Sequence, residues 1–120
     1  MTVDFPRWFD LSDRTVDLIY FDYRVTLQFG GGSRVEVESP FTIHGLSEHP
    51  IEIEPEAVAN PGAVLAALHQ RAVDVSIGDS SELTVRLSNS TWIIPADDHY
   101  ESWHLHHGEM NLTCPAGGLF

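Results

Sequence analysis

The sequence has no lysine and only one cysteine, Cys114. A single cysteine excludes an intrachain disulfide and fits a reducing compartment. Basic residues are scarce, because six arginines stand against 18 acidic residues, which gives a net charge of -12 over 120 residues. This balance argues against a nucleic-acid partner, since a phosphate backbone attracts cationic surfaces. It argues equally against binding to an anionic membrane surface.

Long apolar runs are also missing, so no membrane-spanning helix is expected. The N-terminus lacks the basic stretch and apolar core of a secretory signal, and with the cysteine count this predicts a cytoplasmic protein. Apolar residues make up 42% of the chain, which is enough to close one core. We therefore expect a single domain over residues 1–120.

Apolar and polar residues alternate along several segments, as they do in antiparallel strands with one buried face. The clearest case is a hairpin of residues 23–29 and 33–38, joined by three glycines that suit a tight turn. Further strands are expected at 15–21, 51–54, 73–77, 83–87, 91–94 and 110–114, and residues 41–43 form a short apolar piece between Pro40 and Gly45.

One helix is expected over residues 61–71, because Asn60-Pro61 places a capping side chain before a proline at the first helical position. Val64, Leu65 and Leu68 would share its buried face. The resulting fold class is α+β, mostly antiparallel, with two β-hairpin units and one short helix packed on the sheet.

Two further patterns bear on the fold. Residues 5–12 space their aromatic side chains as in a short helical lead-in. Residues 25–29 match 83–87 at an offset of 58, and an internal repeat and a chance likeness explain this equally well. The expected core consists of Val25, Leu27, Phe29, Val35, Val37, Leu65, Leu68, Val85, Leu87, Ile94, Trp103 and Leu112.

Short motifs in the sequence carry a resemblance. A Pro-x-Asp step begins at Pro95, and Tyr-Glu-x-Trp follows at residues 100–103. Pro40-Phe41 comes after the first hairpin, and a glycine-rich stretch fills residues 115–118. In these motifs, over about residues 18–118, the chain resembles a family of small uncharacterised proteins of high-GC actinobacteria. That family is a domain of unknown function, so the resemblance implies a shared fold and supplies no activity.

The histidines are the first candidates for chemistry, since four of the seven lie within residues 99–107. On a strand, His104 and His106 share one face, and such a pair can begin a divalent metal site. Glu101 is expected on the opposite face. A third ligand would then come from His44, His49 or Asp97. The alternative, a solvated strand without metal, is favoured.

No catalytic residue or cofactor site stands out. Cys114 is in phase with Met110 and Leu112, so it is expected to pack as a small apolar residue. The glycine triplet lacks the lysine and the helix of a phosphate-binding loop. Asp97 and Asp98 suit a turn after a proline. The sequence therefore favours a protein that is not an enzyme.

The favoured function is a non-enzymatic interaction module for a basic protein partner, with an acidic immunity or antitoxin-like inhibitor as its concrete form. Its contact surface would be an acidic and aromatic patch of Asp97, Asp98, Tyr100, Glu101 and Trp103. Both aromatic residues of this patch also suit the core.

Two other functions stay open. One is a metal-binding protein or metal-dependent enzyme that uses His104 and His106. The other is a homodimer that forms when an edge strand, such as 51–54 or the C-terminal strand, pairs between two copies. The homodimer is compatible with the interaction module.

Overall fold

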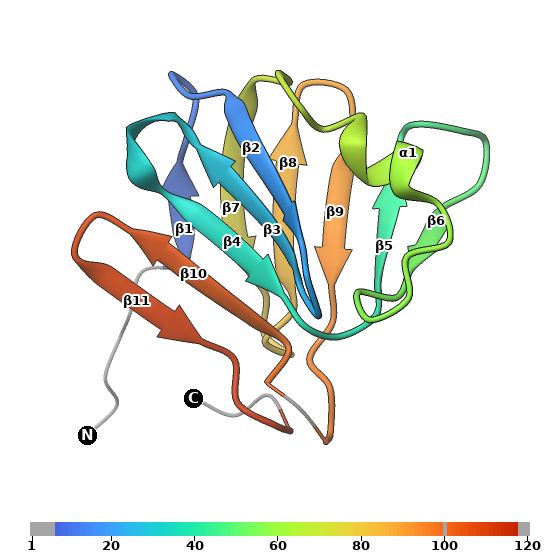
Figure 1. The fold of residues 1–120 in the computed structure, drawn as a ribbon. Helices are drawn as coiled ribbons and strands as arrows, with labels where there is room; N and C mark the ends of the chain where they lie inside the picture. The colour runs from blue at the N-terminus through green and yellow to red at the C-terminus, as the bar shows by residue number, and fades with distance from the viewer. Residues whose placement is uncertain (1–6, 100, 118–120) are drawn as a thin grey trace, which may run out of the picture.

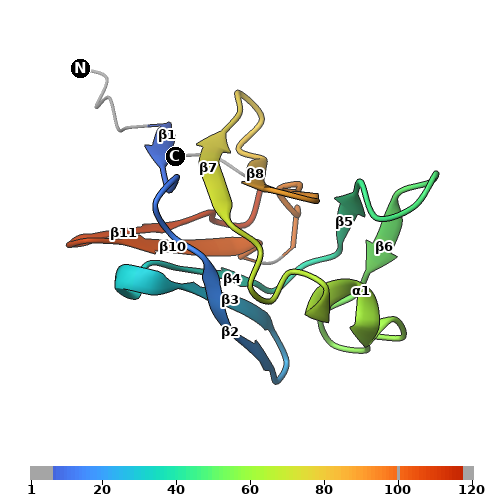
Figure 2. The same cartoon turned by 90° about the horizontal axis from the view of Figure 1, so that it is seen from above.

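A computed structural model describes residues 7–99 and 101–117, which form two antiparallel sheets packed face to face (Figures 1 and 2). The back sheet has the order β1 (Trp8–Asp10), β7 (Ala72–Ile77), β8 (Leu83–Leu87), β9 (Thr91–Ile94), β5 (Phe41–His44) and β6 (Ile51–Ile53). The front sheet has the order β11 (Met110–Thr113), β10 (Trp103–His107), β4 (Arg34–Val37), β3 (Val25–Phe29) and β2 (Val16–Phe21). Their inner faces share one hydrophobic core.

The two halves of the chain follow the same strand plan. β2, β3 and β4 form a meander in the front sheet, and β7, β8 and β9 form one in the back sheet. The hairpin after each meander then crosses to the opposite sheet, so that β5 pairs with β9 and β10 pairs with β4. Residues 25–29 and 83–87, which are alike in sequence, are thus the middle strands of equivalent meanders.

The two crossing segments, residues 38–40 and the described part of 95–102, meet at the lower end of the sandwich in Figure 1. The backbone N–H of Glu38 donates to the carbonyl of Ser102 at 2.9 Å, which joins one crossing to the other. Side chains from distant parts of the sequence therefore come together at this end.

The predicted hairpin of β3 and β4 is confirmed. Leu27 lies opposite Val35, and the side chains of both are fully buried. The 3₁₀ turn η1 (Gly30–Gly32) joins the strands, with φ of 84° at Gly31 and 92° at Gly32, in the region that favours glycine. The other predicted strands are also present, within a residue or two of their expected ends.

The predicted α+β class is wrong, because the described part of the chain is mostly β and contains no long helix that covers a sheet. The helix expected over 61–71 is only α1 (Pro61–Leu65), and Asn60 makes no side-chain cap. The chain then leaves the helix, because the N–H of His69 donates to Val16 and the N–H of Val16 donates to Gln70. No helix in residues 7–99 or 101–117 has the length and apolar character to cross a membrane.

The packing of this segment differs from the prediction as a result. Val64 and Ala67 are buried, whereas Leu65 is 47% and Leu68 36% exposed. Five residues make little more than one turn, too few for a continuous helical face to reach the sheet. The helical lead-in over 5–12 is also wrong, since its described part contains β1, which pairs with β7.

The remaining core prediction is largely confirmed. The buried members are Val25, Leu27, Phe29, Val35, Val37, Val85, Leu87, Ile94 and Trp103. Leu112 is half-buried and packs against them. These residues were identified by period-2 alternation, which reports the buried face of a strand directly.

A buried carboxylate holds three strands of the back sheet together. Asp74 on β7 is only 3% exposed, and its two oxygens accept hydrogen bonds from Trp8 Nε1 at 2.9 Å and Arg86 Nε at 2.7 Å. The bonds from Arg86, and then the bond from Trp8, hold the pKa of Asp74 below its ordinary value against the opposing effect of burial. The short strand β1 is tied to the sheet in this way.

We expect Trp103→Phe to destabilise the protein more than Trp92→Phe. Both indoles are fully buried, but Trp103 Nε1 donates to the Ser81 carbonyl at 2.9 Å, and Trp92 Nε1 has no partner among the described residues. The lost bond should cost roughly 1–3 kcal/mol beyond the matched loss of apolar area. Urea unfolding followed by circular dichroism measures the free energy of unfolding of both variants, and an equal decrease in the two would contradict the expectation.

We expect Asp74→Asn to lower the free energy of unfolding at pH 7 by roughly 1–3 kcal/mol, because charge-assisted bonds are lost. The pKa of Asp74 lies below 3.8, so the unfolded chain takes up this proton at higher pH than the folded chain does. The stabilisation that ionised Asp74 contributes is fully present above its pKa in the unfolded chain, and it is lost as the pH falls through its pKa in the folded chain. The gap between wild type and variant should therefore narrow on acidification in urea titrations, and a constant gap would refute this account.

Candidate functional site

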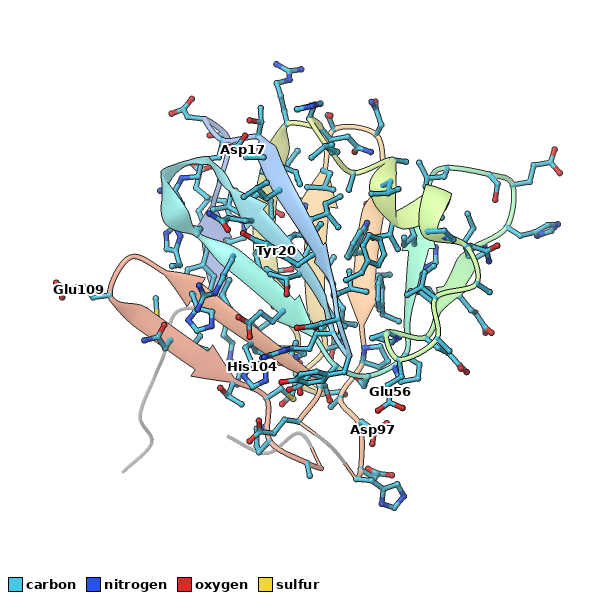
Figure 3. All side chains as sticks on the ribbon, in the orientation of Figure 1. Asp17, Tyr20, Glu56, Asp97, His104 and Glu109 are labelled. Atoms are coloured by element: carbon cyan, nitrogen blue, oxygen red, sulfur yellow. The ribbon has the colours of Figure 1, made fainter. Side chains whose placement is uncertain are left out.

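Carboxylates gather at the lower end of the sandwich, where the strands connect. Glu38 follows β4, two residues follow β6, and two lie between β9 and β10. Figure 3 shows Glu56 and Asp97 at this end, with His104 above them on the front sheet. We call this set the acidic end: Glu38, Glu54, Glu56, Asp97 and Glu101. The crossing of the two hairpins is what assembles it.

Two hollows open at the acidic end. One, of about 290 Å³, is lined by Tyr23, Glu38, Glu56, His99 and Glu101. The other, of about 240 Å³, is lined by Glu38, Pro40, Glu54, Pro55, Glu56 and Asp97. They share Glu38 and Glu56, and no arginine is among the residues named. Negative charge is therefore concentrated against concave walls, which focus the field.

Three side chains converge beside the first hollow. His104 Nε2 lies 2.5 Å from Glu38 Oε2 and 3.6 Å from Glu101 Oε2. The ligand atoms of all three residues lie within 4.8 Å of one another. His104 Nδ1 lies 3.0 Å from Thr113 Oγ1, a contact that orients the imidazole through its other nitrogen. One imidazole and two carboxylates suit zinc or manganese, and without a metal they form a His–Glu pair.

The predicted pair of His104 and His106 does share one face of β10, but the two do not share a site. His106 Nδ1 lies 2.5 Å from Asn111 Oδ1, and its Nε2 faces Glu36 at 3.7 Å. Glu101 was expected on the opposite face, yet it lies beside His104. The strand begins at Trp103, so the alternation of faces does not extend back to Glu101.

The residues considered as a third ligand for this pair do not belong to the cluster of Glu38, Glu101 and His104. His44 is on β5 of the back sheet, where its Nε2 contacts Thr42 Oγ1 at 3.1 Å. His49 lies in the turn before β6. Asp97 belongs to the acidic end, but the metal-ligand cluster found among the described residues does not include it.

The outer face of the front sheet is balanced in charge, unlike the acidic end. Glu36 accepts a hydrogen bond from Arg24 at 2.8 Å and pairs with Arg34 at 3.0 Å. His106 faces the same carboxylate. Two of the six arginines are thus paired with Glu36 in the middle of this face, and the Arg24 guanidinium also lies over the ring of Tyr23.

The predicted acidic and aromatic patch is not one continuous surface. Trp103 is fully buried, so it belongs to the core. Tyr100 lies outside the described residues. Asp98 and Glu101 are exposed, and Asp97 Oδ1 accepts a hydrogen bond from the N–H of His99 at 2.8 Å, as expected of a turn residue.

Sequence reasoning missed Glu38, Glu54 and Glu56 as members of the site, since charged residues that alternate with apolar ones are typical of the solvated face of a strand. One signal does mark them. Each is next to or near a proline, Pro40 or Pro55, where the chain leaves a sheet. The convergence itself could not be found, because it depends on which strands pair across the molecule.

Two other candidates belong to the interior. Cys114 is fully buried, and burial raises the pKa of its thiol, so it packs as predicted and is not an activated nucleophile. His107 turns inward, with Nδ1 3.1 Å from Arg14 and 2.9 Å from Ser33 Oγ. Burial and then the Arg14 charge lower the pKa of His107, which keeps it neutral.

Comparison with known proteins gives one relationship. No curated protein and no solved structure matches the chain. A family model does match, and it covers residues 8–120, which is nearly the whole sequence. The chain belongs to the family of unknown function DUF6188.

Proposed function

We propose that this protein is a non-enzymatic interaction module that binds a basic protein partner through its acidic end. One observation carries the proposal: five carboxylates from three connections border two adjoining hollows that no arginine lines. A field focused in this way steers a cationic partner and raises its association rate. The net charge of -12 extends the same attraction to longer range.

The acidic end has groups ready to receive basic side chains. Glu54 and Glu56 are exposed and make no side-chain hydrogen bond or ion pair among the described residues. The buried Pro55 between them restrains the backbone. Tyr23 is 54% exposed and lines the first hollow, and the guanidinium of Arg24 lies over its ring, 4.6 Å from the centroid. An arginine of the partner would thus meet the exposed carboxylates of Glu54 and Glu56.

The concrete form that we propose is an immunity or antitoxin-like inhibitor that masks the basic surface of a toxin. We also propose that it acts in the cytoplasm of an actinobacterium. The single buried cysteine supports a reducing compartment, and the lack of lysine supports a high-GC source. In this proposal the Pro-x-Asp and Tyr-Glu-x-Trp motifs within residues 95–103 are characteristic sequence motifs of the family.

The test is affinity capture from the native host at low and high salt, with wild type and with Glu54→Gln/Glu56→Gln. We expect wild type to retain a basic protein at low salt and to release it at high salt, because screening weakens the attraction. The variant should retain at least tenfold less of this protein than wild type does, since two exposed carboxylates of the acidic end are neutralised. Quantitative mass spectrometry of the bound fraction gives the ratio.

The matched control is Glu48→Gln/Glu109→Gln, which changes the net charge equally at exposed positions outside the acidic end. It should capture the partner as wild type does. If both variants lost the captured protein equally, binding would depend on the total charge of the chain and not on the acidic end. Absence of any basic partner from the wild-type fraction would remove the proposal.

A second candidate function is binding of a divalent metal by Glu38, Glu101 and His104. The observation that favours it is their convergence within 4.8 Å, with Thr113 orienting the imidazole. A metal would replace the His–Glu contact with bonds of about 2.0–2.2 Å. It would also neutralise part of the acidic end, so the two functions compete for the same carboxylates.

For the metal, we expect zinc or manganese titrated into the purified protein to raise the melting temperature by several degrees at saturating concentration. His104→Ala should abolish this shift. His106→Ala, a histidine on the same face that is not in the cluster, should retain it. Differential scanning fluorimetry compares each variant with its own metal-free baseline. No shift in wild type, or an equal shift in His104→Ala, would exclude this site.

A further inference from the structure

The edge strands of the two sheets are unequally protected. Among the described residues the edges are β1 and β6 in the back sheet and β2 and β11 in the front sheet. β1 and β6 have three residues each, and β6 carries Glu52 outward. β11 has four residues, with polar Asn111 and Thr113 on its outer face. Short length and polar side chains are the usual protection against pairing with another chain.

β2 lacks this protection. It has six residues, and its stretch from Leu18 to Phe21 has no charged residue in a chain of net charge -12. Leu18 is 46%, Tyr20 48% and Phe21 42% exposed. A six-residue edge strand with an apolar and uncharged stretch of this kind is expected to pair with another strand or to aggregate.

The backbone groups of β2 are also available. Asp22 N–H donates to the Arg24 carbonyl on the β3 side, so strict alternation turns the N–H and C=O groups of Phe21 and Ile19 to the opposite side. Only the start of β2 is covered there, since Val16 exchanges two hydrogen bonds with residues 69–70. We call residues 17–21 the open edge of β2.

We infer that a second copy of this chain pairs with the open edge of β2. The two β2 strands run antiparallel about a two-fold axis at Ile19, and the two front sheets become one continuous ten-stranded sheet. The homodimer expected from sequence thus forms at β2, the least protected edge, and not at β6 or β11.

The register follows from the backbone geometry. In an antiparallel pair, residues whose N–H and C=O groups point to the partner lie opposite one another, so Ile19 meets the partner's Ile19. Leu18 then lies opposite the partner's Tyr20, in the closely spaced type of pair. Asp17 lies opposite the partner's Phe21. No carboxylate faces another carboxylate across the strands.

The charge distribution also permits this dimer. β2 runs toward Tyr23, which lines a hollow of the acidic end. Antiparallel pairing therefore places the two acidic ends at opposite ends of the joint sheet, where their repulsion is screened over about 8 Å at physiological salt. The contact is made mainly by the uncharged stretch from Leu18 to Phe21 of each copy, and the one carboxylate in it, Asp17, faces the partner's Phe21.

The test is sedimentation equilibrium of the full chain from 1 to 500 µM at low and physiological salt. The expected mass rises toward twice 13.4 kDa, and more so at higher salt, because screening reduces the repulsion between copies. Amide hydrogen exchange at Ile19 and Phe21 should slow as the concentration rises. A strict monomer at 500 µM, or a dimer without this protection, would overturn the inference.

Two variants locate the contact. Ile19→Pro removes an outward N–H, and Tyr20→Glu places a carboxylate against the apolar edge; each should raise the dissociation constant at least tenfold. Val73→Glu is the control, since Val73 is also apolar and 42% exposed but lies on β7, which is paired on both sides. It should dimerise as wild type does.

Circular dichroism checks that each variant folds, and Tyr20→Glu tests the contact even where Ile19→Pro does not fold. Dimers that persist in Tyr20→Glu would place the interface elsewhere and overturn the inference. Binding of a basic partner weakens with salt, whereas this dimer strengthens. The opposite salt dependences therefore distinguish a failure of the proposed partner binding from a failure of the proposed dimer.

Discussion

The exchange of hairpins between the two sheets is the constraint on which the rest of this structure depends. Neither half of the chain completes its own sheet, because β5 and β6 finish the sheet of the second meander, and β10 and β11 finish that of the first. Three of the strand pairings among the described residues, β1 with β7, β4 with β10 and β5 with β9, join parts of the chain that are distant in sequence, which slows folding. The exchange also forces residues 38–40 and 95–102 to pass each other, and the Glu38–Ser102 hydrogen bond lies at that crossing.

The crossing explains where the acidic end lies, but not why it is acidic. Like charges held together destabilise a fold, and the outer face of the front sheet shows the ordinary remedy, with Glu36 between Arg24 and Arg34. At the acidic end Glu38 and Glu101 contact His104, and the described residues that line the two hollows include no arginine. Nothing in the packing requires exposed Glu54 and Glu56 to flank a buried proline beside them. This excess of one sign is the strongest reason to regard the acidic end as a binding surface.

What could be predicted from the sequence was local. Alternation identified the strands and their buried faces, and the glycines identified the hairpin turn, because both signals are contained in a few neighbouring residues. Alternation does not say which strand lies next to which, so the sandwich, the exchange and the convergence on Glu38 were not visible. The helix failed for a related reason, since residues 69–70 form hydrogen bonds with Val16, a partner more than 50 positions away. Glu101 was assigned to the wrong face because a periodic pattern carries no mark of where its strand begins.

The two surfaces of this molecule differ in kind, and their arrangement connects them. The acidic end is a concentration of negative charge, whereas the open edge of β2 offers apolar side chains and outward-facing backbone groups. Because β2 runs toward Tyr23 at the acidic end, a two-fold pair of β2 strands directs the two acidic ends away from each other. Such a dimer presents two equivalent acidic surfaces to a basic partner, and a partner with two basic sites gains from the higher effective concentration of the second contact. Dimerisation would then strengthen partner binding without adding any contact to the acidic end.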